Sequence, residues 1–198
     1  WSYLAVAGEK TIDKRISSIT LRDGGIINLF DDNLEAFWDE IGLLPLLKEG
    51  NYDVEHNYVR IGDLKGSDGI FRLDLNSDDR TQSDMVFIES SNEPGRHWIE
   101  PYRPSQLVSV SADNTLTFAL TQKEANDVTF ADKINIYGET LYDYELSIDH
   151  ETISSEDLAE LEDQIKSNYT DFEDFKVSDY EDGTRWFINR VTVSESAA

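Results

Sequence analysis

The side chains best spaced for chemistry lie between residues 74 and 84, where carboxylate and amide oxygens stand at positions 74, 76 and 78. Alternate oxygens of this kind begin loops that bind calcium, which prefers carboxylate and carbonyl ligands. The segment departs from the EF-hand loop, because Asp79 replaces its turn glycine and Met85 replaces its bidentate glutamate. A calcium site of another type would use Asp74, Asn76, Asp78 and Asp84. The alternative interpretation is a polar loop rich in turn-forming residues.

A second group of carboxylates lies in residues 151–182, where twelve acidic side chains accompany two lysines. The spacing of Leu158, Leu161 and Ile165 predicts a helix near 155–168 with one apolar face. Its acids can present negative charge to a basic partner or imitate a row of phosphates. The expected partner-binding residues are Glu156, Asp157, Glu160, Glu162, Asp163, Asp171, Glu173 and Asp174. The alternative is a solvated helix face, whose N-terminal acids are favoured by the helix dipole.

Other catalytic patterns are missing from the sequence. The three histidines, His56, His97 and His150, are too far apart in the chain for the local spacing of a zinc site. No Gly-x-Ser-x-Gly motif supplies a hydrolase nucleophile, and Gly66-Ser67-Asp68-Gly69 lacks the lysine of a phosphate-binding loop. We therefore assign no catalytic or cofactor-binding residue and expect no cofactor apart from the calcium candidate. The chain is expected not to be an enzyme.

The charge of the chain restricts its partners. Forty-one acids face seventeen lysines and arginines, which gives a formal net charge of −24. Nucleic-acid backbones and anionic membranes are bound through cationic side chains, so direct binding to either is not expected. Cysteine is absent, which excludes disulfides. Proteins with basic surfaces are the partners that this charge favours, and a homo- or hetero-oligomeric assembly is expected.

The elements that position these residues are expected to be mostly strands. Apolar runs on both sides of Asp23-Gly24-Gly25 predict a hairpin. A short helix near 32–42 follows, capped by Asp32 with Glu35 and ended by Gly42 and Pro45.

Short alternating segments separated by turn residues occupy residues 51–148, and Leu116, Phe118 and Leu120 illustrate the period of two. This pattern predicts an α+β, β-rich fold with a mainly antiparallel sheet, sandwich or barrel-like, and two short helices near 32–42 and 155–168. No internal repeat is evident. Residues 1–198 are expected to form a single β-rich domain, with 151–198 as an acidic appendage of a helix and strands packed on or beside it.

These observations predict a non-catalytic structural or protein-interaction component. An extracellular, cell-surface or virion location is favoured over the cytoplasm, because a chain that starts at Trp1 suggests processing. One alternative is an acidic nucleic-acid mimic that inhibits a DNA-binding protein. Another is a carbohydrate-binding module or small glycosidase, which would stack sugars on Trp98, Tyr102 or Trp186.

Overall fold

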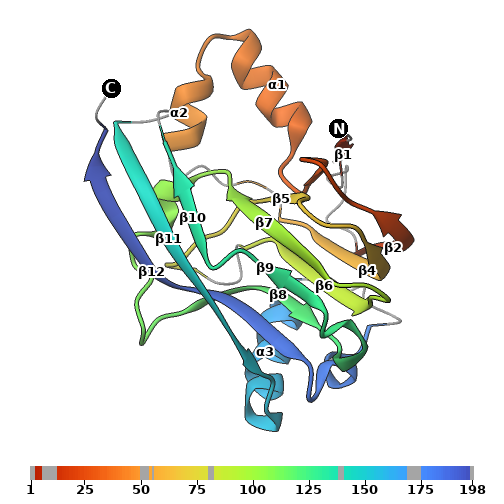
Figure 1. The fold of residues 1–198 in the computed structure, drawn as a ribbon. Coiled ribbons are helices and arrows are strands. Elements are labelled where there is room, and N and C mark those ends of the chain that lie inside the picture. The colour runs from red at the N-terminus through yellow and green to blue at the C-terminus, as the bar shows by residue number, and fades with distance from the viewer. Residues whose placement is uncertain are drawn as a thin grey trace.

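Two β-sheets form the body of the protein (Figure 1). The computed structural model describes residues 3–5, 13–49, 54, 56–79, 83–137, 141–168 and 175–196. Within these ranges, sheet A has five strands, in the order β1 (Tyr3–Ala5), β3 (Ile26–Asn28), β5 (Ile70–Leu73), β7 (Gly95–Pro101) and β9 (Val128–Phe130). Sheet B has seven described strands, in the order β10 (Lys133–Ile136), β11 (Tyr142–Thr152), β12 (Thr184–Glu195), β8 (Leu116–Thr121), β6 (Met85–Ser90), β4 (Tyr58–Lys65) and β2 (Asp13–Thr20).

The strands of the two sheets alternate along the chain, so that the backbone coils into a stack of rungs. Each rung runs along sheet B, turns a tight corner and returns along sheet A: β2 with β3, β4 with β5, β6 with β7, and β8 with β9. Successive rungs pair in parallel, as Tyr58 pairs with Met85 in sheet B and Ile70 with Trp98 in sheet A. The described chain therefore repeats in structure, although no repeat was predicted from its sequence.

The prediction of a mainly antiparallel sheet is wrong, because sheet A is all-parallel and sheet B is mixed. The Asp23-Gly24 turn joins β2 to β3, which lie in different sheets and do not pair with each other. Both residues have positive φ, as a tight turn requires, but this turn forms a rung corner instead of a hairpin. The β-rich class itself is confirmed.

Among the described strands of sheet B, every antiparallel pair includes β11 or β12. β11 and β12 pair antiparallel over their length, and β12 pairs antiparallel with β8. β10 completes this edge by pairing antiparallel with β11.

The main core lies between the sheets and is built from rows of stacked apolar side chains. Ile27, Phe71 and Ile99 share one register row of sheet A, and all three are buried. Ile61 and Ile88 form a corresponding row in sheet B. Burial of such rows removes apolar surface from water at every rung, which holds the stack together.

Helices occupy two places outside the stack, as Figure 1 shows: α1 (Asp32–Glu40) and α2 (Leu44–Glu49) at one end, α3 (Ser155–Asn168) at the other. The predicted cap is displaced by one residue, since Asp31 accepts hydrogen bonds from the N–H groups of Asn33 and Leu34. Pro45 lies in the first turn of α2, a position that tolerates proline, so it does not end the helical region. Short 3-10 turns cover Pro104–Leu107, Lys123–Ala125 and Val177–Tyr180.

The segment that follows β11 packs against the outer face of sheet B. Leu161 and Ile165 of α3, with Tyr180, form a second core with Tyr58, Met85, Phe87 and Leu120 of the sheet. A 3-10 turn at Val177–Tyr180 precedes β12. No helix in the described ranges is both long and apolar enough to cross a membrane.

Candidate functional site

Polar side chains from three successive rungs meet on the side of the stack where the chain passes from sheet A back to sheet B. His56 precedes β4, Asp74 and Asp84 lie on the connection from β5 to β6, and Arg103 and Gln106 follow β7. The parallel stacking places these connections above one another, and all five side chains are buried. We call these five residues the corner cluster.

Asp74 is the centre of the corner cluster. It accepts hydrogen bonds from Arg103 Nε at 3.0 Å and Nη2 at 2.7 Å. His56 Nε2 lies 3.1 Å from the same carboxylate, and Gln106 Nε2 donates to it at 3.1 Å. Burial alone would raise the pKa of Asp74, but the hydrogen bonds from His56 and Arg103 hold it below its ordinary value.

Asp84 has a different environment although it lies beside Asp74. Its carboxyl oxygens accept the backbone N–H groups of Asn57 at 2.8 Å and Asp74 at 2.7 Å. Burial raises the pKa of Asp84 to about 8. Burial would lower the pKa of His56, but its hydrogen bond to Asp74 and the charge of Asp84 raise it above the ordinary value.

The structure separates the four residues of the calcium hypothesis into two pairs. Asp74 and Asp84 belong to the corner cluster, where protein donors occupy their oxygens. Asn76 instead stabilises the exposed turn by accepting the N–H groups of Asp78 and Asp79, and Asp78 accepts the hydroxyl of Ser109 at 2.6 Å. Within the described part of the chain, no group of three or more His, Cys, Asp or Glu side chains is placed to hold a metal ion. Calcium binding stays a prediction that these contacts do not support.

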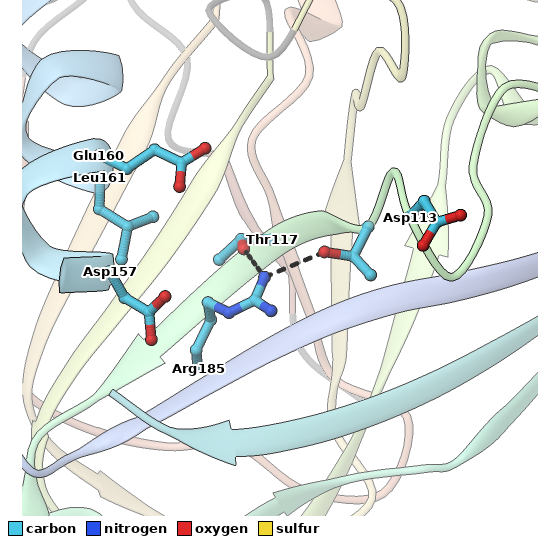
Figure 2. A pocket seen from close by; sticks show the side chains of 7 residues that line it. Asp113, Thr117, Asp157, Glu160, Leu161 and Arg185 are labelled. Atoms are coloured by element: carbon cyan, nitrogen blue, oxygen red, sulfur yellow. Dashed lines mark hydrogen bonds between the residues drawn. The ribbon is translucent and has the colours of Figure 1, made fainter. Parts of the chain in front are cut away.

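A hollow of about 220 Å³ lies between α3 and the strands β8 and β12. Its central cation is Arg185 of β12, which donates to Glu151 from Nε at 3.0 Å and Nη2 at 2.8 Å. Nη1 of Arg185 donates to Thr117 at 2.6 Å, and the guanidinium lies 4.0 Å from the ring centre of Phe187. Figure 2 shows Arg185 between the α3 side chains Asp157 and Glu160 on one side and Asp113 on the other.

The carboxylates of this hollow suit a basic side chain, and the chain supplies one itself in Arg185. Thr115 accepts a further, longer hydrogen bond from the same Nη1 atom at 3.3 Å. Arg185 therefore joins β12 to β8 and β11 through polar contacts at one wall of the hollow.

The predicted partner-binding acids have separate roles in the structure. Asp157 and Ser154 form a reciprocal capping pair at the start of α3, each accepting the backbone N–H of the other at 3.2 Å. Glu156, Glu160 and Asp163 are exposed, and Glu162 is half-buried. Asp171, Glu173 and Asp174 lie outside the described residues.

Helical spacing places Glu156, Glu160 and Asp163 on one face, opposite Leu161 and Ile165, which pack on the sheet. Such a face is what an ordinary surface helix presents to solvent. Both its interaction with a basic partner and the imitation of a nucleic acid stay predictions.

The three aromatic side chains considered for sugar stacking do not form a shared platform. Tyr102 and Trp186 are buried, the first stacked on Phe30 and the second packed against Phe130. Trp98 is half-buried, and the guanidinium of Arg96 lies 5.1 Å from its ring centre. These contacts give no support to a carbohydrate-binding surface on these residues.

Sequence reasoning did not single out Arg103, His56, Gln106 or Arg185. Each stands far along the chain from its partner, so no local spacing connects them: Arg103 and Asp74 are 29 residues apart, and Arg185 and Glu151 are 34 apart. No protein-family model matches the sequence, and no curated protein matches it.

Proposed function

We propose that the protein is a non-catalytic structural or protein-interaction component. The observation that supports this function best is the corner cluster, in which the buried side chains of His56, Arg103 and Gln106 are hydrogen-bonded to Asp74. Asp74 with Arg103 ties two successive connections of the stack together. A buried carboxylate that accepts two hydrogen bonds from one guanidinium holds the two chain segments rigidly together. Because the two groups bind each other, neither is available to a substrate.

The stacked architecture supports the same function. Parallel rungs bury apolar rows from one rung to the next, so a stack of this kind offers a stiff body with long outer surfaces. The net charge of −24 favours solubility before assembly and repels other acidic molecules. Together these properties suit a component that docks on other proteins outside the cell, on a cell surface or on a virion.

Cross-linking in the native source, followed by mass spectrometry, tests this function. We expect one dominant partner, which should bind the purified protein directly in a pairwise titration. A stable monomer that recovers no partner and turns over a substrate with saturable kinetics would contradict the proposal.

A further inference from the structure

The apolar side chains of α1, α2 and the turn between them are packed in one part and exposed in another. Leu34, Trp38, Leu44 and Leu47 pack around Phe30 and Tyr102 to form a small separate core. Beside them, four large side chains are exposed: Phe37 by 56%, Ile41 by 48%, Leu43 by 42% and Leu46 by 49%. We call these four residues the helical apolar surface.

The helical apolar surface consists of two pairs of neighbouring side chains. Phe37 lies on α1 and Ile41 directly follows it, and the N–H of Ile41 donates to the carbonyl of Phe37, so the two side chains share a face. Leu43 and Leu46 are three apart, and the N–H of Leu46 donates to the carbonyl of Leu43. The apolar face of a surface helix is ordinarily buried against a core, whereas these four side chains are exposed. The helical apolar surface is therefore a candidate contact surface.

Further apolar side chains lie at the same end of the molecule. Figure 1 shows α2 next to the ends of β10 and β11. Lys48 of α2 and Tyr137, which follows β10, line the same hollow of about 230 Å³. Tyr137 is 68% exposed, and Leu141, just before β11, is 75% exposed. Exposed apolar side chains therefore occur at this end of the molecule outside the helices as well.

The charges around the helical apolar surface indicate the chemistry of its partner. Asp39 and Glu40 are exposed at the end of α1. The ammonium group of Lys48 instead lies 5.3 Å from the ring centre of Tyr102, on the packed side. The whole chain has a net charge of −24, which disfavours the binding of a second copy or of an anionic membrane to this surface.

We infer that α1 and α2 form a docking element for a partner protein that presents an apolar surface flanked by lysine or arginine. This inference rests on the proposed interaction function and assigns it a surface. Phe37 and Leu46 supply the buried anchors, while Asp39 and Glu40 meet the flanking basic side chains.

A titration with two synthetic peptides tests this inference. One is an amphipathic helix of leucine and lysine, and the other has the same composition in scrambled order. The protein should bind the amphipathic peptide at least tenfold more tightly. The double variant Phe37→Ser/Leu46→Ser should lose this preference, because it removes the anchors without touching the small core beneath. The matched control is Val108→Ser, which removes a 60% exposed apolar side chain elsewhere and should bind as the wild type does.

Equal affinity for the two peptides, or equal binding by the double variant, would overturn the inference. Sedimentation that detects a dimer lost in the double variant would identify a second copy as the occupant. Binding to zwitterionic vesicles that the double variant loses would identify a lipid surface. Either result overturns the inference. If a partner from the native source binds the double variant as tightly as the wild type, the inference fails but the proposed interaction function stands.

Discussion

Asp84 accepts the backbone N–H of Asp74 at 2.7 Å, so two fully buried carboxyl groups lie beside each other in one corner of the stack. Of these two carboxyl groups, Arg103 binds that of Asp74. The described donors to Asp84 are two backbone N–H groups. The pKa of Asp74 is therefore below its ordinary value, whereas that of Asp84 is above it. Because these pKa values differ from those of the unfolded chain, the stability of the fold depends on pH.

The first prediction concerns Asp84 and the pH range from 6.5 to 8. The pKa of Asp84 is about 8 in the folded protein and 3.8 ordinarily, so the folded state retains a proton that the unfolded chain releases. The raised pKa of His56 acts in the same direction above 6.5, whereas His97, with a pKa of about 4 in the folded protein and 6.5 ordinarily, opposes it near pH 6.5 and no longer acts near pH 8. The free energy of unfolding should therefore fall as pH rises, by up to about 1.4 kcal/mol per pH unit for each proton.

Urea unfolding at several pH values across this range measures the slope. Asp84→Asn should reduce it, while Glu156→Gln, which changes an exposed carboxyl group, should leave it unchanged. A free energy of unfolding that rises with pH in the wild type would show that Asp84 is ionised throughout.

The second prediction concerns the cation of the corner cluster. Arg103→Met leaves the buried carboxylate of Asp74 without its main partner, and should lower the free energy of unfolding by about 3–5 kcal/mol. The double variant Asp74→Asn/Arg103→Met should recover part of that loss, because no uncompensated charge remains. Chemical denaturation of the four members of this cycle gives the coupling.

The matched control is Arg15→Met, which breaks the bidentate pair of Arg15 with Glu89 at the surface. This change should cost no more than about 1 kcal/mol. Equal losses for Arg103→Met and Arg15→Met would mean that burial of the corner cluster has no energetic consequence.

The third prediction concerns the tight corners of the rungs, where Gly24 and Gly66 both have positive φ. A Cβ atom at Gly66 would collide with the backbone carbonyl of Leu21 in the preceding rung, whereas a Cβ at Gly24 meets open space. Gly24→Ala should cost about 1–2 kcal/mol from the backbone conformation alone. Gly66→Ala should cost about 1–3 kcal/mol more, from the added overlap. Comparison of the melting temperatures of the two variants tests whether the close approach of Gly66 to the preceding rung causes the additional loss of stability.

The fourth prediction concerns the exposed acids of α3. Glu156 and Glu160 are four residues apart and repel each other on the helix surface. The variant Glu160→Gln/Asp163→Asn, which keeps Glu156 in the first turn where the helix dipole favours it, should raise the free energy of unfolding by about 0.2–0.5 kcal/mol at low ionic strength. The gain should vanish near about 1 M salt, where surface charges are screened. A loss of stability at either salt concentration would show that these carboxylates stabilise the fold.

The β-rich class could be predicted from the sequence, because alternation along Leu116, Phe118 and Leu120 is a local property. The parallel pairing could not be predicted from turns, since Asp23-Gly24 has the same local conformation in a rung corner as in a hairpin. One signal was available in the sequence, namely the four consecutive apolar residues from Met85 to Ile88, all of which are buried in the structure. Such a run is typical of a strand covered on both faces, as parallel strands are.

The candidate site was predictable only in part. Asp74 and Asp84 drew attention through their oxygen spacing, but the chemistry of their corner depends on His56 and Arg103. These partners become neighbours only when separate rungs stack. Their proximity is therefore a property of the register between strands, which no local pattern encodes.

The position of β12 between β8 and β11 has a consequence for synthesis on the ribosome. The strand edge of β8 stays open until residues 184–188 have been made, because these residues pair with 116–121. During that interval a nascent chain exposes an unpaired hydrogen-bonding edge that can capture another molecule. Pairing of β12 with β8 thus sets the moment at which this edge is closed.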